Sequence, residues 1–472
     1  MPSHKDLLEK IIATDKTFQD KDIQSFAESF MSKLPEGDVS GMSSDEMAAV
    51  IKDHWELSKK RKLGEAKLEI KLAQFSKNNS AKGRSKTRTA TVISIVCDDM
   101  AFTINSIASE LMRESFKFDR FFHPRIQTKA QQAMVKKQVD ARTSRRFGET
   151  HIYIQIDAIL NKEEMRELEQ SLRSVLEDVQ LANKEWPLML EDLKSAMNQI
   201  EKNEGYCPAQ ALDEYKQFLN YLYDDNFTLL GTFELDLKAK SPKPENAHGL
   251  MSPERGAPYF DFQEEGFPLW NNPGNSKQTP LIVTKLKKLS SVHRIVPLDA
   301  VSVIIYDEKG VPEKELVFIG LFTSVTYSRS IQDVPYLRQK ADSVIKQSGF
   351  LPAGHDYKAL RHILEKFPRD ELFQIDEDSL AVMVMSIMRL QQQPRIALFT
   401  RNNPYNNLFS CMVYFPREQF DTRLRLKVQR ILEEELNGKT RDFFTTMDDS
   451  LLARVMFILV TKRQIGETSD ID

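Results

Sequence analysis

Cysteine, long apolar runs and a surplus of one charge are all scarce in this sequence of 472 residues. The three cysteines, Cys97, Cys207 and Cys411, are too widely separated for a disulfide framework or a close-spaced metal cluster, and so few thiols fit a reducing compartment. No apolar run reaches the roughly 18 residues of a membrane span, and the N-terminus has no apolar signal region. The net charge of -3 gives no general attraction to nucleic acid or membranes. We expect a cytoplasmic protein without nucleic-acid or membrane partners.

The motifs of common catalytic and cofactor sites are missing as well. No Gly-x-Gly-x-x-Gly follows a predicted strand, so there is no dinucleotide-binding fingerprint. Gly438-Lys-Thr440 is like the end of a phosphate-binding loop, but Glu433 stands where the first glycine of that loop belongs. His355 and His362 are seven residues apart, which is not the His-x-x-x-His spacing of a helical metal site. The sequence therefore predicts no catalytic residue, no cofactor-binding residue and no metal ligand.

The overall composition is typical of a globular protein with several hydrophobic cores. Apolar residues make up 41% of the chain and charged residues 29%, and the length corresponds to three domains of about 150 residues each. Residues 1 to 75 predict helices, one of them capped by Ser43 or Ser44. The polar and cationic stretch Ser76–Arg88 then marks the clearest boundary, and we interpret it as a solvated linker because no aromatic residue interrupts it.

The next segment, residues 89–185, has an order of elements that indicates a fold. Ala90–Val96 predicts a strand, and Asp98-Asp99 begins a helix. Phe116–Phe122 and the alternating segment that starts at His151 predict two more strands, with Ile152, Ile154 and Ile156 on one side; a long helix follows. Strand, helix, strand, strand, helix is the ferredoxin-like arrangement, with helices packed on one face of an antiparallel sheet.

The remainder of the chain predicts a second antiparallel sheet and a mixed C-terminal block. Glu315–Phe322 is an apolar strand, and its Gly320 predicts a bulge or a close backbone approach. Asp333 is expected to cap a helix that Gly349 ends. The block from Asp376 onward predicts helices alternating with apolar strands, the last of them Ala453–Val460.

One long stretch carries a specific resemblance. It contains Phe318-Ile-Gly-Leu-Phe-Thr-Ser324, Tyr327-Ser-Arg-Ser-Ile-Gln-Asp-Val-Pro-Tyr336, Gly354-His-Asp-Tyr-Lys-Ala-Leu360 and Leu364-Glu-Lys-Phe-Pro-Arg-Asp-Glu-Leu-Phe-Gln374. Together with the upstream segments His293-Arg-Ile-Val-Pro-Leu-Asp299 and Cys97-Asp-Asp-Met-Ala-Phe-Thr-Ile-Asn-Ser106, it resembles the N-terminal half of the large bacterial NAD-specific glutamate dehydrogenases. This chain has Ala101 where that family usually has proline.

The resemblance implies an α+β fold in which N-terminal helices precede ferredoxin-like ACT modules that flank a PAS-like antiparallel sheet module. We expect a helical segment and basic linker at 1–86, a first ACT-like domain at 87–204, a PAS-like domain at 205–375 and a second ACT-like domain at 376–472. The two ACT-like modules show no readable sequence repeat, so their duplication is inferred from the family alone.

The resemblance also implies a function without catalysis in this chain. In the family, the catalytic residues and the NAD-binding domain lie beyond the position that corresponds to Asp472. We therefore expect a regulatory and oligomerisation region that works with a catalytic half, in cis or in trans, and that forms homo-oligomers through its ACT-like modules. The alternative is a free-standing amino-acid sensor of the ACT/PAS type without a catalytic partner. A reading frame that continues into a Rossmann domain separates the two hypotheses.

The best candidates for binding a small amino-acid effector lie in the first ACT-like strand-to-helix turn. They are Asp98, Asp99, Phe102 and Asn105. The carboxylates suit an ammonium group, and the N–H groups at the start of the helix suit a carboxylate. The simpler interpretation, which the sequence leaves open, is that both aspartates cap the helix.

Overall fold

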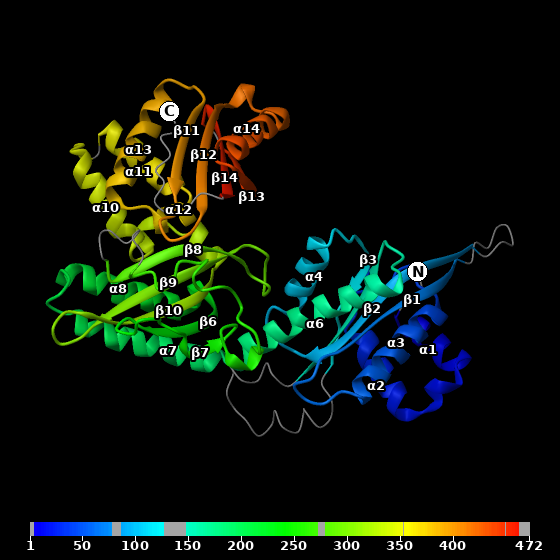
Figure 1. Cartoon of the computed structure of the whole chain (residues 1–472). Helices are drawn as coiled ribbons and strands as arrows, with labels where there is room; N and C mark the ends of the chain where they lie inside the picture. Colours follow the sequence, from blue (N-terminus) through cyan, green and yellow to red (C-terminus); the bar gives the residue numbers. More distant parts are fainter. Residues whose placement is uncertain are drawn as a thin grey trace. The chain divides into compact units, whose positions relative to one another are not determined.

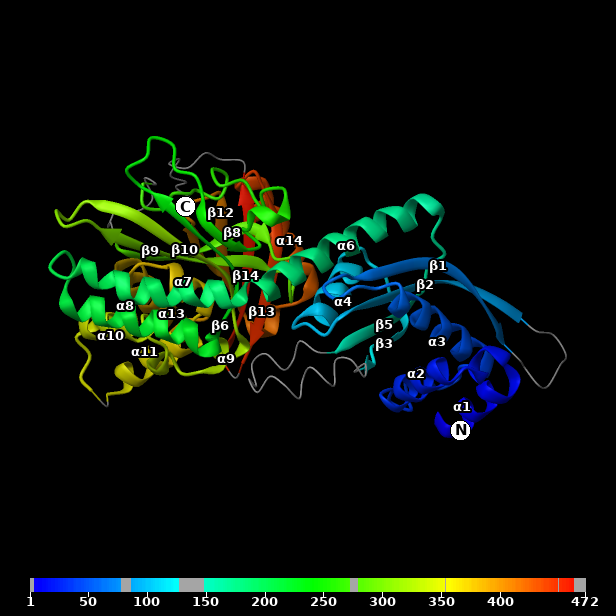
Figure 2. The same cartoon turned by 90° about the horizontal axis from the view of Figure 1, so that it is seen from below.

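The computed structural model describes residues 4–77, 86–126, 148–271, 279–352, 354–448 and 450–461. The chain forms two compact units (Figures 1 and 2). Unit 1 comprises Met1–Asn183 with Ser291–Ile295, and unit 2 comprises Lys184–Ser290 with Val296–Asp472. Among the helices of the described residues, none is both long enough and apolar enough to cross a membrane.

Unit 1 is an antiparallel sheet between two layers of helices. Its strands lie in the order β1-β2-β5-β3, and the short β4 also pairs with β5. The elements are α1 (His4–Thr14), a 3-10 helix (Lys16–Gln19), α2 (Lys21–Ser32), α3 (Ser44–Lys59), β1 (Lys67–Lys77), β2 (Lys86–Asp98), α4 (Thr103–Arg113), β3 (Phe118–Phe122), β4 (Arg125–Ile126), β5 (Glu149–Ile156) and α6 (Lys162–Lys184).

The alternation of side chains along the strands gives this sheet two apolar faces. Ile152, Ile154 and Ile156 pack with α4 and α6, as the alternating pattern predicted. Val92 and Tyr153 face the opposite way and pack with α1, α2 and α3, which lie on the other side of the sheet in Figure 1. The prediction that the two helices of this segment pack on one face of the sheet is therefore confirmed. The N-terminal helices, which that prediction did not include, bury the second face.

Two predictions for the N-terminal segment have opposite outcomes. Ser43 caps α3: its Oγ accepts from the Glu46 backbone N–H at 3.2 Å, while Glu46 Oε2 accepts from the Ser43 N–H at 2.8 Å. The prediction that residues 1–75 are all helical is wrong, since Lys67–Lys77 forms the edge strand β1, paired with β2. Part of the predicted linker Ser76–Arg88 also belongs to this hairpin, and residues 78–85 of that linker lie outside the described residues.

Unit 2 contains two sheets, a set of helices and a shared core. One sheet has the order β7-β6-β10-β9-β8 and the other the order β11-β12-β14-β13. The first group of elements is α7 (Trp186–Gln199), a 3-10 helix (Ile200–Asn203), α8 (Ala209–Tyr221), a π-helical turn (Leu222–Asn226), β6 (Phe227–Asp236), β7 (Glu245–Gly249), a 3-10 helix (Pro253–Arg255), β8 (Leu281–Leu289), β9 (Pro297–Tyr306) and β10 (Pro312–Phe322). The second group is α9 (Ser324–Ser328), a 3-10 helix (Ile331–Asp333), α10 (Leu337–Ser348), α11 (His355–Lys366), α12 (Arg369–Gln374), α13 (Glu377–Gln392), β11 (Ala397–Asn402), β12 (Leu408–Pro416), a 3-10 helix (Arg417–Gln419), α14 (Thr422–Glu435), β13 (Gly438–Met447) and β14 (Leu452–Thr461).

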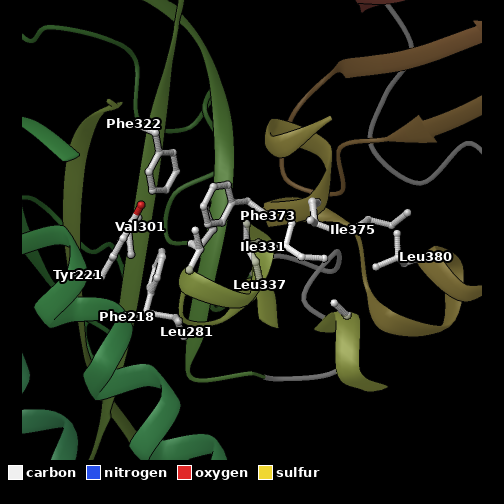
Figure 3. Close-up of a cluster of buried hydrophobic side chains, with 14 of the residues drawn as sticks. Phe218, Tyr221, Leu281, Val301, Phe322, Ile331, Leu337, Phe373, Ile375 and Leu380 are labelled. Carbon is white, nitrogen blue, oxygen red and sulfur yellow. The ribbon is translucent and has the colours of Figure 1, made fainter. Parts of the chain in front are cut away.

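The core of unit 2 joins these parts through aromatic and aliphatic side chains. Phe322 of β10 stacks on Phe373 of α12 (Figure 3), and their ring centroids are 4.2 Å apart. Met412 and Tyr414 of β12 belong to the same buried cluster, so one face of the C-terminal sheet shares its core with the helices. Burying this much aromatic surface favours a single packed body over separate lobes.

The strand β10 confirms the prediction for Gly320. The β10–β6 register shifts between Ile319 and Gly320, which is the predicted irregularity. A Cβ at Gly320 would lie 2.2 Å from the Thr228 carbonyl oxygen and 2.6 Å from Cε1 of Phe227, so only glycine fits. The prediction for Asp333 is wrong, because α10 begins after Tyr336 and Asp333 belongs to a preceding 3-10 helix. Gly349 does end α10, in the left-handed conformation.

The sheet of unit 1 and the C-terminal sheet have the same topology. Read along the chain, each has two hairpin strands, a helix and two further strands, and the fourth of these strands lies beside the second. Thus β1-β2-β5-β3 corresponds to β11-β12-β14-β13, and all pairings are antiparallel. The family resemblance implies two similar modules, and the two sheets do share one strand order.

Candidate functional site

The candidate effector turn connects β2 to α4 in unit 1. Phe102 is the residue before the helix; its φ of 69° lies in the left-handed region, and its side chain makes no capping hydrogen bond. Neither Asp98 nor Asp99 occupies the capping position, so the interpretation of the two aspartates as helix caps is wrong. Their carboxylates are free to serve other partners, and the structure shows which.

Asp98 is bound to a buried arginine. Nη1 of Arg61 donates to Oδ1 of Asp98 at 2.6 Å, and the Gly64 backbone N–H donates to Oδ2 at 2.9 Å. The same guanidinium holds Glu149, at 2.7 Å from Nη2 and 3.1 Å from Nε, and only 2% of the Arg61 side chain is exposed. A buried arginine between two carboxylates holds both of them in place through charge-assisted hydrogen bonds. Asp98 thus has a structural role in this turn.

Glu149 is the most strongly perturbed carboxylate near the turn. Burial would raise its pKa, but the 3.5 Å contact with Nε2 of His151, the bonds from Arg61 and the 2.8 Å bond from the Ser58 hydroxyl outweigh burial and lower the pKa to about 2. At 3.5 Å this is a long polar contact rather than an aligned hydrogen bond, and with the His151 ring neutral it is not an ion pair. Glu149 therefore stays ionised across the physiological pH range.

Asp99 is more accessible than Asp98. Its Oδ1 accepts from the Thr150 hydroxyl at 3.2 Å and lies 3.3 Å from Nε of Arg125, whose side chain is 62% exposed. Its backbone N–H donates to the Gly148 carbonyl at 2.8 Å, which continues the strand pairing by one residue. Asp99 and Arg125 together place a partly buried carboxylate and an exposed guanidinium side by side at the turn.

The substitution of alanine for proline at position 101 has a structural consequence. The Ala101 N–H donates to Oδ1 of Asn183 at 3.2 Å, and Nδ2 of Asn183 donates back to the Ala101 carbonyl at 3.1 Å. A proline has no N–H and could not make the first of these bonds. The amide of Asn183, on α6, therefore fixes the turn in place of a proline ring.

Phe102 and Asn105 both contact His293, a residue of the short segment Ser291–Ile295 that belongs to unit 1. The Phe102 and His293 rings are 4.9 Å apart between centroids, and Nδ2 of Asn105 lies 3.4 Å from Nδ1 of His293. The His293 N–H donates to Oγ of Ser106 at 2.8 Å. Burial and the nearby Arg294 lower the pKa of His293, which favours the neutral ring that can accept from Asn105. Two of the four predicted residues, Phe102 and Asn105, thus contact the same histidine.

Two groups of buried charged residues were not identified from the sequence, one beside this turn and one in unit 2. Arg61 and Glu149 flank apolar segments, but nothing in their spacing marks them as buried partners. In unit 2, Nζ of Lys285 lies 2.9 Å from Asp299 and 3.3 Å from Asp370, and the Tyr327 hydroxyl donates to Asp370 at 2.7 Å. Burial raises the pKa of Asp299 to about 6, against the opposing charge of Lys285.

These unit 2 charges fix helices to strands and do not form an open site. Lys285 lies on β8, Asp299 on β9 and Asp370 on α12, so the network ties two strands to the helix at the end of the resemblance stretch. Nearby, Glu371 binds Arg401 of β11 and accepts from the Ser410 hydroxyl of β12. Within the described ranges, no group of three or more His, Cys, Asp and Glu side chains is arranged to hold a metal ion.

The corresponding turn of the C-terminal module is built differently. There the connection from β12 to α14 ends at Asp421, whose Oδ1 accepts from the Leu424 N–H at 2.7 Å. This helix start is therefore capped by its own side chain, whereas the start of α4 is not. The start of α4 therefore lacks the side-chain cap that the start of α14 has.

Comparisons with known proteins agree with this architecture. Three family models match the chain: glutamate dehydrogenase, ACT1 domain, at residues 26–172; glutamate dehydrogenase, helical motif 1, at residues 334–393; and glutamate dehydrogenase, ACT2 domain, at residues 397–472. The ACT1 match contains the candidate turn and the strands β1 to β5 of the first sheet, the helical motif contains α10 to α13, and the ACT2 match begins at β11.

Three similar proteins are all named NAD-specific glutamate dehydrogenase. The protein of Halomonas elongata is 29% identical over 96% of this chain, and that of Pseudomonas aeruginosa is 28% identical over 92%. The protein of Mycobacterium tuberculosis is 24% identical over 69% of the chain. The chain spans only 29%, 27% and 19% of the lengths of these relatives, respectively. By these matches the chain belongs to the NAD-specific glutamate dehydrogenase family and carries its ACT1 domain, its helical motif 1 and its ACT2 domain.

Proposed function

We propose that this chain is the regulatory and oligomerisation region of a large NAD-dependent glutamate dehydrogenase, an enzyme that converts L-glutamate to 2-oxoglutarate and ammonia. The observation that supports this most directly is the order ACT1, helical motif 1, ACT2 along one chain, with the same strand order in both ACT sheets. A relative that aligns with 96% of the chain and is itself a dehydrogenase favours this function over a free-standing amino-acid sensor.

In this proposal the chemistry belongs to a catalytic half, in cis or in trans, that also binds NAD. The chain alone then forms no NADH from glutamate and NAD. Incubating the purified chain with both and following absorbance at the NADH band tests this. NADH formation that is abolished by mutating one of the chain's own residues would contradict the proposal.

The candidate effector is a small amino acid bound at the β2–α4 turn. Asp99 offers a carboxylate to the ammonium group, while Arg125, 3.3 Å from it, and the uncapped start of α4 offer positive partners to the carboxylate. Phe102 and Asn105 border the same turn. Since Asp98 is held by Arg61, its role is to position the turn rather than to contact the ligand. Calorimetric titration with common amino acids is the measurement that tests this site.

The middle of the chain forms a PAS-like module in this proposal. Its five strands in the order β7-β6-β10-β9-β8 make an antiparallel sheet, and α7 and α8 pack against one face of it. An antiparallel sheet with helices to one side is what the family resemblance implies for this position. Titrations that locate any effector here instead of at the β2–α4 turn would reassign the regulatory role.

Homo-oligomers are proposed to form through the ACT modules. The strand β13 is an edge of its sheet, and Phe443, Phe444 and Met447 on it are 41%, 49% and 53% exposed. An edge strand with exposed aromatic residues is a natural surface for pairing with another chain. Phe444→Lys is expected to shift the chain toward the monomer in sedimentation velocity, whereas Val382→Lys on α13, where Val382 is 70% exposed, is the matched control.

A cytoplasmic location completes the proposal. All three cysteines are free thiols, and Cys97 and Cys411 are buried. Burial raises the pKa of both thiols to about 12, so they are inert side chains and not poised for oxidation. Such thiols suit a reducing compartment.

A further inference from the structure

Two histidines face each other inside unit 1, between α3 and the sheet. His54 comes from α3 and His151 from β5, and both are fully buried. Their ring centroids are 5.5 Å apart, with the rings nearly edge to face. Phe26 and Phe30 of α2 pack against His151, and Phe30 also packs against His54. The pair is enclosed by aromatic rings.

Most ring nitrogens of this histidine pair have no hydrogen-bond partner among the described residues. Among the described residues, neither ring nitrogen of His54 has a hydrogen-bond partner, and the same holds for Nδ1 of His151. The hydroxyls of Ser94 and Tyr153, on the same face of the sheet, have no partner within the described ranges either. Buried polar groups normally have hydrogen-bond partners, and each one without a partner lowers the stability of the fold. Several such groups at one interface indicate a functional site rather than a purely structural one.

The charged groups around the pair come from several elements. Glu149 on β5 lies 3.5 Å from His151 and is itself held by Arg61, from the segment after α3. Lys71 on β1 acts on His54 through its positive charge. Burial is the main cause that lowers the pKa of both histidines, and each is lowered further by a neighbouring cation or imidazole. For His151 the anion Glu149 opposes this without reversing it.

We propose that the His54–His151 pair is a proton-sensitive latch that holds α3 against the first sheet and, through Arg61, holds the β2–α4 turn. A proton on either imidazole places a charge among Phe26 and Phe30 and beside the other imidazole, which favours moving α3 away from β5 into water. Ser58, in the last turn of α3, and Arg61, two residues after it ends, bind Glu149, and Arg61 also binds Asp98 at the turn. Movement of α3 therefore removes the partners that fix the turn.

The direction of the pH effect follows from proton linkage. Each histidine has a lower pKa in the folded chain than its ordinary value of 6.5. The open state therefore binds more protons than the closed state, and the latch weakens as the pH falls below about 6.5. Above that pH both states are neutral at the pair, and the latch is closed.

Hydrogen exchange of the full chain at pH 7.5 and pH 5.5, followed by mass spectrometry and corrected for intrinsic rates, tests the latch without any ligand. We expect the protection of α3 and of residues 98–106 to fall by about tenfold for each histidine that stays neutral when closed. The helix α11 of unit 2 is the internal reference, with unchanged protection. No loss of protection at pH 5.5, or a loss in α3 that leaves residues 98–106 unchanged, would refute the proposal.

The test variant carries both His54→Phe and His151→Phe, and the control variant carries His123→Phe alone. Phenylalanine fits the aromatic surroundings of the pair, and in the double variant the protection of α3 should be within about twofold at the two pH values. His123 is exposed in the same unit, and its replacement should leave the pH response intact. A double variant that keeps the parent's pH response contradicts the latch.

If the double variant does not fold, the parent chain still decides the question. With carbon-labelled histidine, the imidazole resonances of the pair should remain neutral down to pH 5.5 in the closed state and change only together with opening. Protonation of the pair near pH 6.5 without opening would overturn the proposal.

Discussion

The two ACT sheets share one strand order but begin their crossing helices in opposite ways. In the second module, Asp421 caps α14 with its own side chain. In the first module, the residue before α4 is Phe102 in the left-handed conformation, without a side-chain cap, and the nearby aspartates are bound to arginines. The modules also differ on their outer faces, since α1, α2 and α3 bury one face of the first sheet.

This difference separates a helix start with a side-chain cap from one without it. A cap satisfies the N–H groups at the start of a helix from within, so nothing else is needed there. Without a cap, those groups and the positive end of the helix remain available to an anion. The same topology therefore gives a structural module at one end of the chain and a candidate binding module at the other.

The largest effect is expected from Arg61→Met. Methionine preserves the stem of the side chain but leaves Asp98 and Glu149 without their shared guanidinium, and removing one partner of a buried ion pair typically costs about 3–5 kcal/mol. Urea unfolding followed by Trp55 fluorescence, in a chain with Trp186→Phe and Trp270→Phe, reports on unit 1. The control Arg417→Met, at the exposed turn of the second module, is followed by circular dichroism because Trp55 does not report on unit 2. It should change stability by less than about 0.5 kcal/mol. Equal effects of the two substitutions would remove the distinction between the turns.

The second largest effect should be the loss of folding stability of unit 1 at low pH. The pKa of Glu149 is lowered from 4.5 to about 2 in the folded chain, so Glu149 stabilises unit 1 above pH 4.5 and this contribution is lost as the pH falls toward 2. A shift of this size corresponds to about 3 kcal/mol. Unfolding measured between pH 5 and pH 2 should show a smaller loss in Glu149→Gln than in the parent. Parallel curves for parent and variant would show that Glu149 does not have this role.

Much of the fold was predictable where a local pattern determines it. Ser43 and Glu46 form a capping box, the isoleucines of β5 alternate between faces, and Gly320 sits where a Cβ has no room. The strand β1 was predicted as helix although Lys67, Leu68, Glu69, Ile70, Lys71 and Leu72 alternate in charge and apolarity along it. A period of two is the pattern of a strand, so in this case the signal was present in the sequence.

The rest depends on contacts that local sequence does not encode. The pairing of Arg61 with Glu149 joins residues 88 positions apart, and nothing in either neighbourhood distinguishes these side chains from solvated ones. The role of Asp98 was predicted as ligand contact or helix cap, whereas the structure shows it bound to Arg61. The ligand role of Asp99, Phe102 and Asn105 and the domain boundaries stay predictions.

A smaller effect is expected from removing the cap of the second module. Asp421→Ala leaves the Leu424 N–H without its acceptor, and loss of an N-cap costs about 1 kcal/mol. Asp421→Asn should be nearly neutral, since asparagine caps as well as aspartate. Both are measured by chemical unfolding of the full chain. A large loss for Asp421→Asn would mean that its charge, and not its capping bond, stabilises this turn.

Calorimetric titration of the full chain with common amino acids, comparing the parent with Asp99→Asn and Asp421→Asn, tests whether the β2–α4 turn is the effector site. We predict that one or more amino acids bind the parent and that Asp99→Asn weakens this binding by about tenfold while the stability of the chain is nearly unchanged. Asp421→Asn should give the curve of the parent. Identical curves for all three proteins, or flat titrations of the parent with every common amino acid, would contradict the assignment of the first ACT turn as the effector site.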